Sequence, residues 1–168
     1  MCVRVIVDAS AVGHFHEPTS NSAGDQVRRW IHRGDGLVVY SPDNTKYARE
    51  LGEKSKIMAL FGDYRQRGLA EVIDSSRIQA ALGQIPGAPV RQSDDRHVLA
   101  LAAASDATVL FSCDGPLRRD FANQQVIPKV GRQPRRSVPD VLIDSPEDTS
   151  HAANRRKFFE TRKCPSSG

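Results

Sequence analysis

The chain has 168 residues, a length that suits one globular domain able to bury an apolar core without disulfides. Apolar residues make up 39%, which is low enough to predict that part of the chain lies outside the packed core. No apolar run approaches the roughly 20 residues that a membrane-spanning helix needs, so we expect no membrane partner.

The three cysteines, Cys2, Cys113 and Cys164, are scattered, odd in number and without CxxC spacing. The sequence therefore predicts neither a disulfide framework nor a zinc site. The first apolar stretch, Val3–Val7, is too short for a signal peptide. Together these features predict a cytoplasmic protein, because disulfides are rare in that reducing compartment.

The net charge of +4 comes from 24 Lys/Arg and 20 Asp/Glu. From Asn123 to Gly168 there are nine Lys/Arg and five Asp/Glu, whereas the first 122 residues hold 15 of each. We therefore predict a domain over residues 1–125 and a basic, proline-containing and partly disordered extension over residues 126–168. Such an extension suits a polyanion such as nucleic acid, and it suits a solvated tail without a specific role equally well.

The first half of the chain alternates between apolar runs and helical spacing. Val3–Val7 predicts a buried strand, and residues 25–32 predict an amphipathic helix. A second strand is expected over residues 38–40. Two helices should follow, one over residues 45–51 with its first residue, Thr45, as the cap, and one over residues 54–67.

The second half continues this alternation. Ser93 has the chemistry of an N-cap for an alanine-rich helix over residues 94–104, and residues 109–111 predict a third strand. A further helix is expected over residues 114–121, with Pro116 in its first turn.

Short apolar strands separated by helices favour an α/β fold with a mostly parallel sheet and crossover helices. Within the extension, residues 141–143 are either one more strand or a docking segment. Residues 154–161 suggest a short helix.

Acidic residues follow the predicted strands or open the predicted helices. Asp8 ends the first strand, Asp94 and Asp95 begin the alanine-rich helix, and Asp114 follows the third strand. Glu50 lies on the helix after the second strand. The carboxyl ends of parallel strands meet at one edge of a sheet, where ligands bind. Carboxylates gathered there repel one another, and a hard cation such as Mg²⁺ or Mn²⁺ relieves that repulsion.

Each acid also has an ordinary structural interpretation. Asp8 and Asp114 could simply cap the helices that follow them. The pair Asp94–Asp95 could stabilise a helix N-terminus through the macrodipole, and only one member of the pair is needed for a metal. Glu50 could be a surface residue, and Glu53 is a close rival for its place. The joint occurrence of these acids in one α/β order is the stronger argument.

Four segments, taken in order, resemble the PIN domain family. They are VIVDAS at residues 5–10, TKYAREL at 45–51, SDDRHVLALA at 93–102 and LFSCDGPLRRDF at 110–121. The resemblance covers roughly residues 3–121, and the third segment is its most specific part.

The resemblance implies a three-layer α/β/α sandwich with a mostly parallel central sheet, described as flavodoxin-like. It also implies a Mg²⁺- or Mn²⁺-dependent endoribonuclease, a class that often serves as the toxin of a toxin–antitoxin pair. RNA, an antitoxin-like protein and a second copy of the chain are therefore the expected partners. By position, Asp8, Glu50, Asp95 and Asp114 match the acidic catalytic residues, the three aspartates being the metal ligands. Ser112 matches a hydroxyl position beside the metal.

Basic residues near these acids are candidates for contacts with the RNA backbone. They are Lys46 and Arg49, just before Glu50, and Arg96, just after Asp95, although a solvated helix face is the alternative for the first two. His97 is either a proton carrier or a packed or capping histidine. An aromatic content of 6% offers few platforms for base stacking, so phosphate contacts should dominate. The alternative function is a non-catalytic PIN-like module for RNA binding or assembly.

Overall fold

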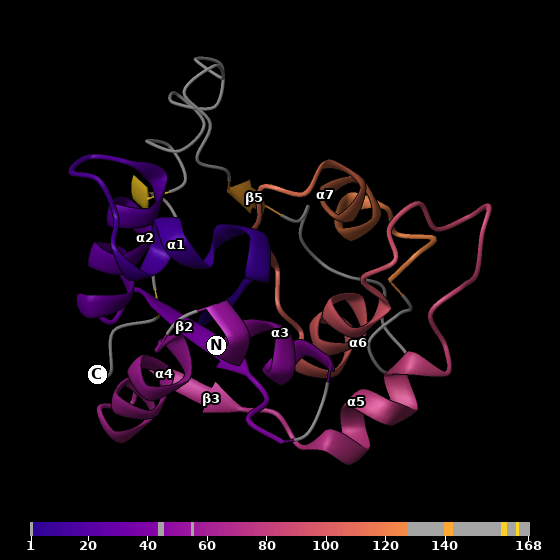
Figure 1. The fold of residues 1–168 in the computed structure, drawn as a ribbon, viewed down its shortest axis with the longest axis horizontal. Coiled ribbons are helices and arrows are strands. Elements are labelled where there is room, and N and C mark those ends of the chain that lie inside the picture. The colour runs from indigo at the N-terminus through magenta and orange to yellow at the C-terminus, as the bar shows by residue number, and fades with distance from the viewer. Residues whose placement is uncertain are drawn as a thin grey trace.

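The computed structural model describes residues 2–43, 46–54, 56–127, 140–142, 159–160 and 164, with the side chains of residues 53, 54 and 140–142 left aside. Within these ranges the chain forms an α/β fold (Figure 1). The strands are β1 (Val3–Val7), β2 (Gly36–Tyr40), β3 (Ala70–Val72), β4 (Val109–Phe111) and β5 (Asp140–Leu142). The helices are the 3₁₀ turn η1 (Ala9–Ala11), α1 (Val12–His16), α2 (Ala23–His32), α3 (Lys46–Lys54), α4 (Ile57–Gln66), α5 (Ser75–Leu82), α6 (Arg96–Ser105) and α7 (Gly115–Ala122).

The five strands form one parallel sheet in the order β3-β2-β1-β4-β5. The chain first builds outward from β1 through β2 to β3, and then crosses to the other side of β1 to form β4 and β5. The direction of winding therefore reverses between β1 and β4, which is the place where open α/β sheets bind ligands. The order differs from the 2-1-3-4-5 order of flavodoxin itself.

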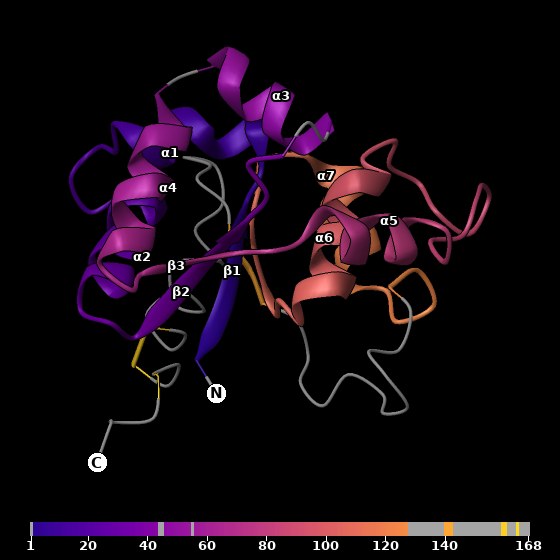
Figure 2. The same cartoon turned by 90° about the horizontal axis from the view of Figure 1, so that it is seen from below.

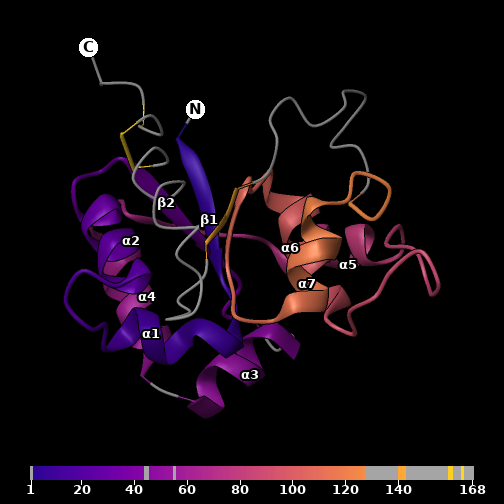
Figure 3. The ribbon, with the colours of Figure 1, turned by 90° about the horizontal axis from the view of Figure 1, so that it is seen from above.

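Helices cover both faces of the sheet, so the predicted three-layer α/β/α sandwich is confirmed. In Figures 2 and 3, α1, α2 and α4 lie on one side of the strands, and α5, α6 and α7 lie on the other. Helix α3 lies at the end of the sheet toward which β1 runs (Figure 2). This position brings α3 to the carboxyl edge, where the predicted acidic residues follow their strands.

The core explains why the strands are continuous apolar runs. A strand covered by helices on both faces must bury both sets of side chains, and Val5, Ile6 and Val7 are all fully buried. Helix α6 packs between β1, α5 and α7, which accounts for its alanine- and leucine-rich sequence. On the opposite face the ring of Phe15 packs edge-on against Phe61.

The predicted elements are largely present, with some differences. The three predicted strands form as β1, β2 and β4, and the five predicted helices over residues 25–121 correspond to α2, α3, α4, α6 and α7. Strand β3 and helices α1 and α5 were not predicted. The assignment of Ser93 as the N-cap of α6 is wrong: the helix begins at Arg96, and the Oγ of Ser93 instead accepts a hydrogen bond from the Asp95 backbone N at 3.0 Å. Thr45 lies outside the described residues.

The extension beyond residue 125 contributes to the same sheet. β5 pairs with β4, with Val109 opposite Asp140 and Phe111 opposite Leu142. The segment at 141–143 therefore includes a strand, and the boundary predicted at residue 125 does not mark the end of the sheet. Of the helix predicted over 154–161, only residues 159–160 are described, and the ring of Phe159 packs edge-on against Trp30 of α2.

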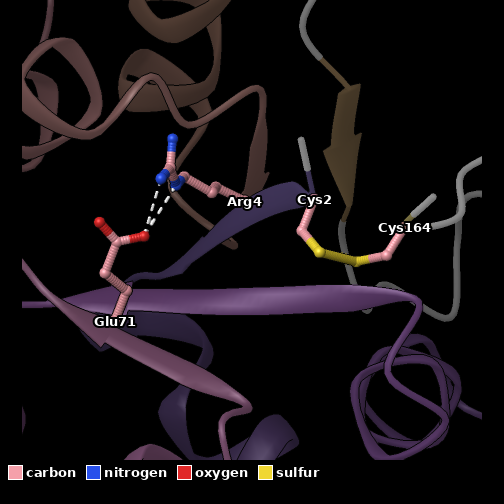
Figure 4. Close-up of a disulfide and its surroundings, with 4 residues drawn as sticks. All are labelled: Cys2, Arg4, Glu71 and Cys164. Carbon is pink, nitrogen blue, oxygen red and sulfur yellow. Dashed lines mark hydrogen bonds and ion pairs between the residues drawn. A yellow bond between two sulfur atoms is a disulfide. The ribbon is translucent and has the colours of Figure 1, made fainter. Parts of the chain in front are cut away.

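Cys2 and Cys164 form a disulfide, so the sequence-based expectation against disulfide bonding is wrong for this pair (Figure 4). Cys2 directly precedes β1, and the bond therefore ties the amino end of the central strand to the far end of the extension. Beside it, Arg4 of β1 reaches across β2 to Glu71 of β3, with its Nη2 2.8 Å from the carboxylate (Figure 4). The pairing of two distant cysteines depends on tertiary structure, which spacing along the chain does not reveal.

Among the residues that the structure describes, no helix is both long and apolar enough to cross a membrane.

Candidate metal centre

The register between β1 and β4 brings Asp8 and Ser112 together. Val7 is opposite Phe111, so the next residue of each strand, Asp8 and Ser112, leaves the sheet at the same level. The Asp8 backbone N donates to the Phe111 carbonyl at 2.9 Å, which continues the ladder one step past the strand. The Ser112 Oγ then donates to Asp8 Oδ2 at 2.9 Å. Asp8 is 4% exposed, so its carboxylate is buried at the carboxyl edge of the sheet.

Two serine hydroxyls connect Asp8 to the β4–α7 turn. The Ser10 Oγ donates to Asp8 Oδ2 and accepts from the backbone N of Cys113 at 3.0 Å. The Ser112 Oγ accepts from the backbone N of Asp114 at 3.0 Å. A continuous hydrogen-bond network therefore fixes Asp114 relative to Asp8, although the two residues come from different strands.

Asp95 lies among the other acids. The pKa of Asp95 is raised, first because burial removes water from its carboxylate and next because the charge of Asp8 repels it. Glu50 and Asp114 also raise this pKa, whereas His97 lowers it. Four carboxylates from separate segments of the chain are thus close enough to interact electrostatically around Asp95.

Helix α3 supplies Glu50 from above the carboxyl edge. Its Oε2 lies 2.9 Å from the Nε2 of His97, and its Oε1 lies 3.5 Å from the Nζ of Lys46 one turn earlier. A carboxylate accepts only, so the imidazole nitrogen donates in this contact. One donor atom each from Glu50, Asp95 and His97 lies within 4.8 Å of the other two, an arrangement that could hold a metal ion.

Tyr47 holds α3 on the edge. Its hydroxyl donates to the carbonyl of Val7 at 3.0 Å, directly before Asp8. Burial raises the pKa of Tyr47, and the charge of Asp8 raises it further, so this hydroxyl keeps its proton and acts as a donor. The contact fixes the first turn of α3, and with it Glu50, relative to the end of β1.

A buried acid of α7 holds the segment that carries Asp95. Asp120 is 1% exposed, and its Oδ2 accepts from the backbone N of Ser93 at 2.6 Å. Both of its oxygens also accept from the backbone N of Gln92 at 3.0 Å. The carboxylate thereby accepts from two backbone donors, the buried one of Ser93 and the part-buried one of Gln92, and it sets where the chain enters α6.

The structural interpretations of Asp8 and Asp114 hold alongside their place in the cluster. Asp8 caps η1 by accepting from the Ser10 N at 3.2 Å, and Asp114 caps α7 by accepting from the Leu117 N at 2.7 Å. Asp8 accepts from Ser10 N, Ser10 Oγ and Ser112 Oγ at the same oxygen, Oδ2, and Asp114 accepts from Leu117 N at Oδ1. Each carboxylate has a second oxygen with its own lone pairs, so capping is compatible with a further ligand.

Within the Asp94–Asp95 pair, Asp95 is the residue that lies in the cluster. The side chain of Asp94 is fully exposed and is 3.7 Å from Arg91 Nη1. Glu50 lies in the cluster through its contact with His97. The side chain of its rival, Glu53, lies outside the described part.

The three basic candidates occupy different places. Lys46 is exposed on α3 beside Glu50, and Arg49 is exposed on the same helix. Arg96 donates from its Nη2 to the carbonyls of Leu82 and Ile85, at 3.1 and 3.2 Å. Arg96 therefore ties the start of α6 to the end of α5, and these bonds draw its guanidinium to that backbone rather than to the carboxylates.

Sequence reasoning did not assign a site role to Ser10, Tyr47 or Asp120, and it left His97 open. Ser10 stands two residues after Asp8 in the first family-like segment, where a hydroxyl next to a strand-end acid was a usable signal. No pattern in the sequence pointed to Tyr47 or to Asp120, because their partners are backbone atoms of distant segments.

The donor set fits a divalent cation. Hard cations take carboxylate and water oxygens, and Glu50 and Asp95 supply two carboxylates with oxygens within 4.8 Å of each other and of a His97 nitrogen. Among the described residues, the donor atoms that all lie within 4.8 Å of one another are those of Glu50, Asp95 and His97. Asp8 and Asp114 lie outside that group, although both act on the pKa of Asp95. A cation in that group would offset the repulsion that raises the pKa of Asp95.

Comparisons of the chain with protein-family models, with curated proteins and with solved structures found no match.

Proposed function

We propose that this protein is a divalent-metal-dependent endoribonuclease that hydrolyses phosphodiester bonds of RNA. One observation carries the proposal: Glu50 and Asp95, from separate segments, have carboxylate oxygens within 4.8 Å of each other and of His97 at the carboxyl edge of the sheet. Asp8 and Asp114 both raise the pKa of this Asp95 carboxylate. The segments that hold them are the ones that resemble the PIN family, whose members use such acids with Mg²⁺ or Mn²⁺.

The residues have distinct tasks in this mechanism. Asp8, Asp95 and Asp114 would hold the cation, and Glu50 would complete the site. A cation held there would lower the pKa of a bound water, which would serve as the nucleophile, and would offset charge on the phosphate. Ser112 keeps the Asp8 carboxylate oriented through its 2.9 Å hydrogen bond. Lys46 and Arg49, exposed on α3, would contact the phosphates of the RNA backbone.

The proposed partners follow from the same resemblance. RNA is the substrate, an antitoxin-like protein would cover the acidic edge, and a second copy of the chain would form a homodimer. We propose a cytoplasmic location for this activity. The Cys2–Cys164 disulfide is the observation that argues against that location, since such bonds are rare in reducing compartments. Alkylation of thiols in freshly lysed cells, followed by mass spectrometry, would show which state the pair adopts.

The experiment is cleavage of a fluorescently labelled unstructured RNA by the purified chain. Cleavage should require Mg²⁺ or Mn²⁺, stop with EDTA, and fall at least 100-fold in Asp8→Asn and in Asp95→Asn. Asp94→Asn is the matched control, because Asp94 is a fully exposed neighbour of Asp95 and should retain the parent rate.

Circular dichroism of each variant would establish that it is folded. If the folded parent binds the RNA in fluorescence anisotropy but leaves it intact with either metal, the nuclease proposal fails and the non-catalytic RNA-binding module takes its place. Cleavage retained by Asp95→Asn would also overturn the proposed mechanism.

A further inference from the structure

The acid cluster includes a donor that is not an acid. His97 is 8% exposed on α6, and its Nε2 lies 2.9 Å from Glu50 Oε2. An imidazole nitrogen is a softer ligand than a carboxylate oxygen, and it suits transition metals better than Mg²⁺. The presence of this nitrogen therefore bears on which metal the centre takes.

Local backbone geometry explains how Asp95 and His97 meet. Two residues that are two apart within a regular helix point to nearly opposite sides. Asp95, however, precedes α6 with φ −85° and ψ 48°, outside the helical geometry, while His97 lies in the first turn. Both side chains can therefore face Glu50, which approaches from α3.

The distances suit donors around one ion. In octahedral coordination with bonds of about 2.1 Å, ligand atoms at right angles lie about 3.0 Å apart. The 2.9 Å between His97 Nε2 and Glu50 Oε2 matches that spacing, and the donor atom of Asp95 is within 4.8 Å of both. An ion would take the place of the proton that Nε2 donates to Oε2, and the neutral imidazole would carry its proton on Nδ1.

We propose that Glu50, Asp95 and His97 form a mixed nitrogen–oxygen site for a divalent transition-metal ion, with His97 Nε2 as a direct ligand. The centre accordingly prefers Mn²⁺ or Ni²⁺ to Mg²⁺. This inference deepens the metal centre of the proposed function, but it does not depend on RNA being the substrate.

The decisive measurement is electron spin-echo envelope modulation of Mn²⁺ bound to the full chain. Directly coordinated ¹⁴N should modulate the echo of the parent, and this modulation should disappear in His97→Asp, which offers oxygen instead. His14→Gln is the control, because His14 is an exposed histidine of α1, and it should keep the parent signal.

Titration calorimetry with Mn²⁺, Ni²⁺ and Mg²⁺ gives a second readout. Removing the ligand in His97→Ala should weaken Mn²⁺ and Ni²⁺ binding beyond the roughly 10–100-fold that loss of an outer partner costs. Mg²⁺ binding should change less, so the selectivity ratio should fall.

The outcomes separate this inference from the proposed function. Bound Mn²⁺ without nitrogen modulation in the parent would show that His97 only orients Glu50, which overturns the inference and leaves the nuclease proposal intact. No Mn²⁺ binding by the folded parent would overturn both. Nitrogen modulation without RNA cleavage would support the metal site and count against the nuclease.

Discussion

The carboxylate of Asp120 accepts a hydrogen bond from the backbone N of Ser93 at 2.6 Å, across 27 residues of sequence. Through this contact α7 holds the segment that places Asp95 at the edge of the sheet. Two backbone N–H groups, those of Gln92 and Ser93, depend on it. A buried carboxylate that satisfies backbone donors is an anchor rather than a reactive group.

Removing this anchor should therefore be costly. We expect Asp120→Ala to lower the free energy of unfolding by about 2–3 kcal/mol, because the buried N–H of Ser93 and the part-buried N–H of Gln92 lose a charged acceptor. Urea denaturation in EDTA would measure the loss. Asp120→Asn keeps one acceptor oxygen and should lose clearly less; an equal loss in both variants would mean that charge, not hydrogen bonding, matters at this position.

The Ser112 hydroxyl should tune the metal centre. Ser112→Ala removes the donor to Asp8 and the acceptor for the Asp114 backbone N. We expect Mn²⁺ affinity to fall roughly 10–100-fold, as is typical when a partner of a ligand is removed. Calorimetry would measure this change.

Ser105→Ala provides the comparison, because Ser105 is also buried and its Oγ donates to the Ala102 carbonyl at 3.4 Å. That variant should leave Mn²⁺ affinity unchanged. Equal affinities for the parent and Ser112→Ala would show that Asp8 does not need this hydroxyl.

The raised pKa of Asp95 predicts that the stability of the metal-free protein depends on pH. Because burial and the neighbouring carboxylates raise the folded pKa of Asp95 above the ordinary value of an aspartate, folding favours the protonated form. The resulting stabilisation is present below about pH 4 and is lost as the pH rises through the folded pKa. At neutral pH the ionised carboxylate of Asp95 therefore lowers the free energy of unfolding.

Asp95→Asn should consequently be more stable than the parent at pH 7 in EDTA, and the difference should shrink as the pH falls toward 4. Thermal unfolding at several pH values would follow it. Saturating Mn²⁺ should narrow the gap, since the metal stabilises only the chain that binds it. If the stability difference between Asp95→Asn and the parent stays constant from pH 7 to 4, ionisation of Asp95 is not its cause.

The Cys2–Cys164 disulfide should stabilise the fold mainly by restricting the unfolded chain. The bond closes a loop with a sequence separation of 162 residues. We expect reduction with dithiothreitol to lower the free energy of unfolding by about 2–5 kcal/mol. Denaturation with and without reductant measures this, and a Cys164→Ser variant should match the reduced parent and no longer respond to reductant.

Two glycines allow a paired test of helix packing. A Cβ at Gly24 of α2 would come within 1.9 Å of the His14 carbonyl oxygen, whereas a Cβ at Gly52 of α3 would meet nothing within 4 Å. Gly24→Ala should lose about 1–3 kcal/mol through overpacking. Gly52→Ala should gain roughly 0.5–1 kcal/mol, because alanine favours a helix. Chemical denaturation of both variants would decide, and a stable Gly24→Ala would mean that α1 moves aside easily.

The three-layer architecture could be predicted from the sequence, because parallel strands that are buried on both faces have continuous apolar sequences. Val3–Val7 and Val109–Phe111 both carry that signal. β3 was missed since its three residues, Ala70–Val72, include Glu71, whose charge is paired with that of Arg4 two strands away. Its place in the sheet thus depends on a contact that local pattern does not contain.

The candidate site was predicted in part for a similar reason. Strand ends meet at one edge in a parallel sheet, so the approach of Asp8 to Ser112 follows from topology. The contact between His97 and Glu50 does not, because it depends on where α3 lies over the edge and on the non-helical backbone of Asp95. The contact between His97 and Glu50 therefore depends on how the elements pack, which the order of residues along the chain does not reveal.

The disulfide also indicates where a label can be attached without disturbing the acidic residues of the candidate site. Cys2 stands at the start of β1, and Asp8 stands past its other end, so the bridge and the carboxylates occupy opposite poles of the sheet. A bead or fluorophore attached at the end of the sheet where Cys164 lies would leave the carboxyl edge accessible to RNA. Surface-tethered assays of RNA and metal are thereby feasible with the edge facing solution.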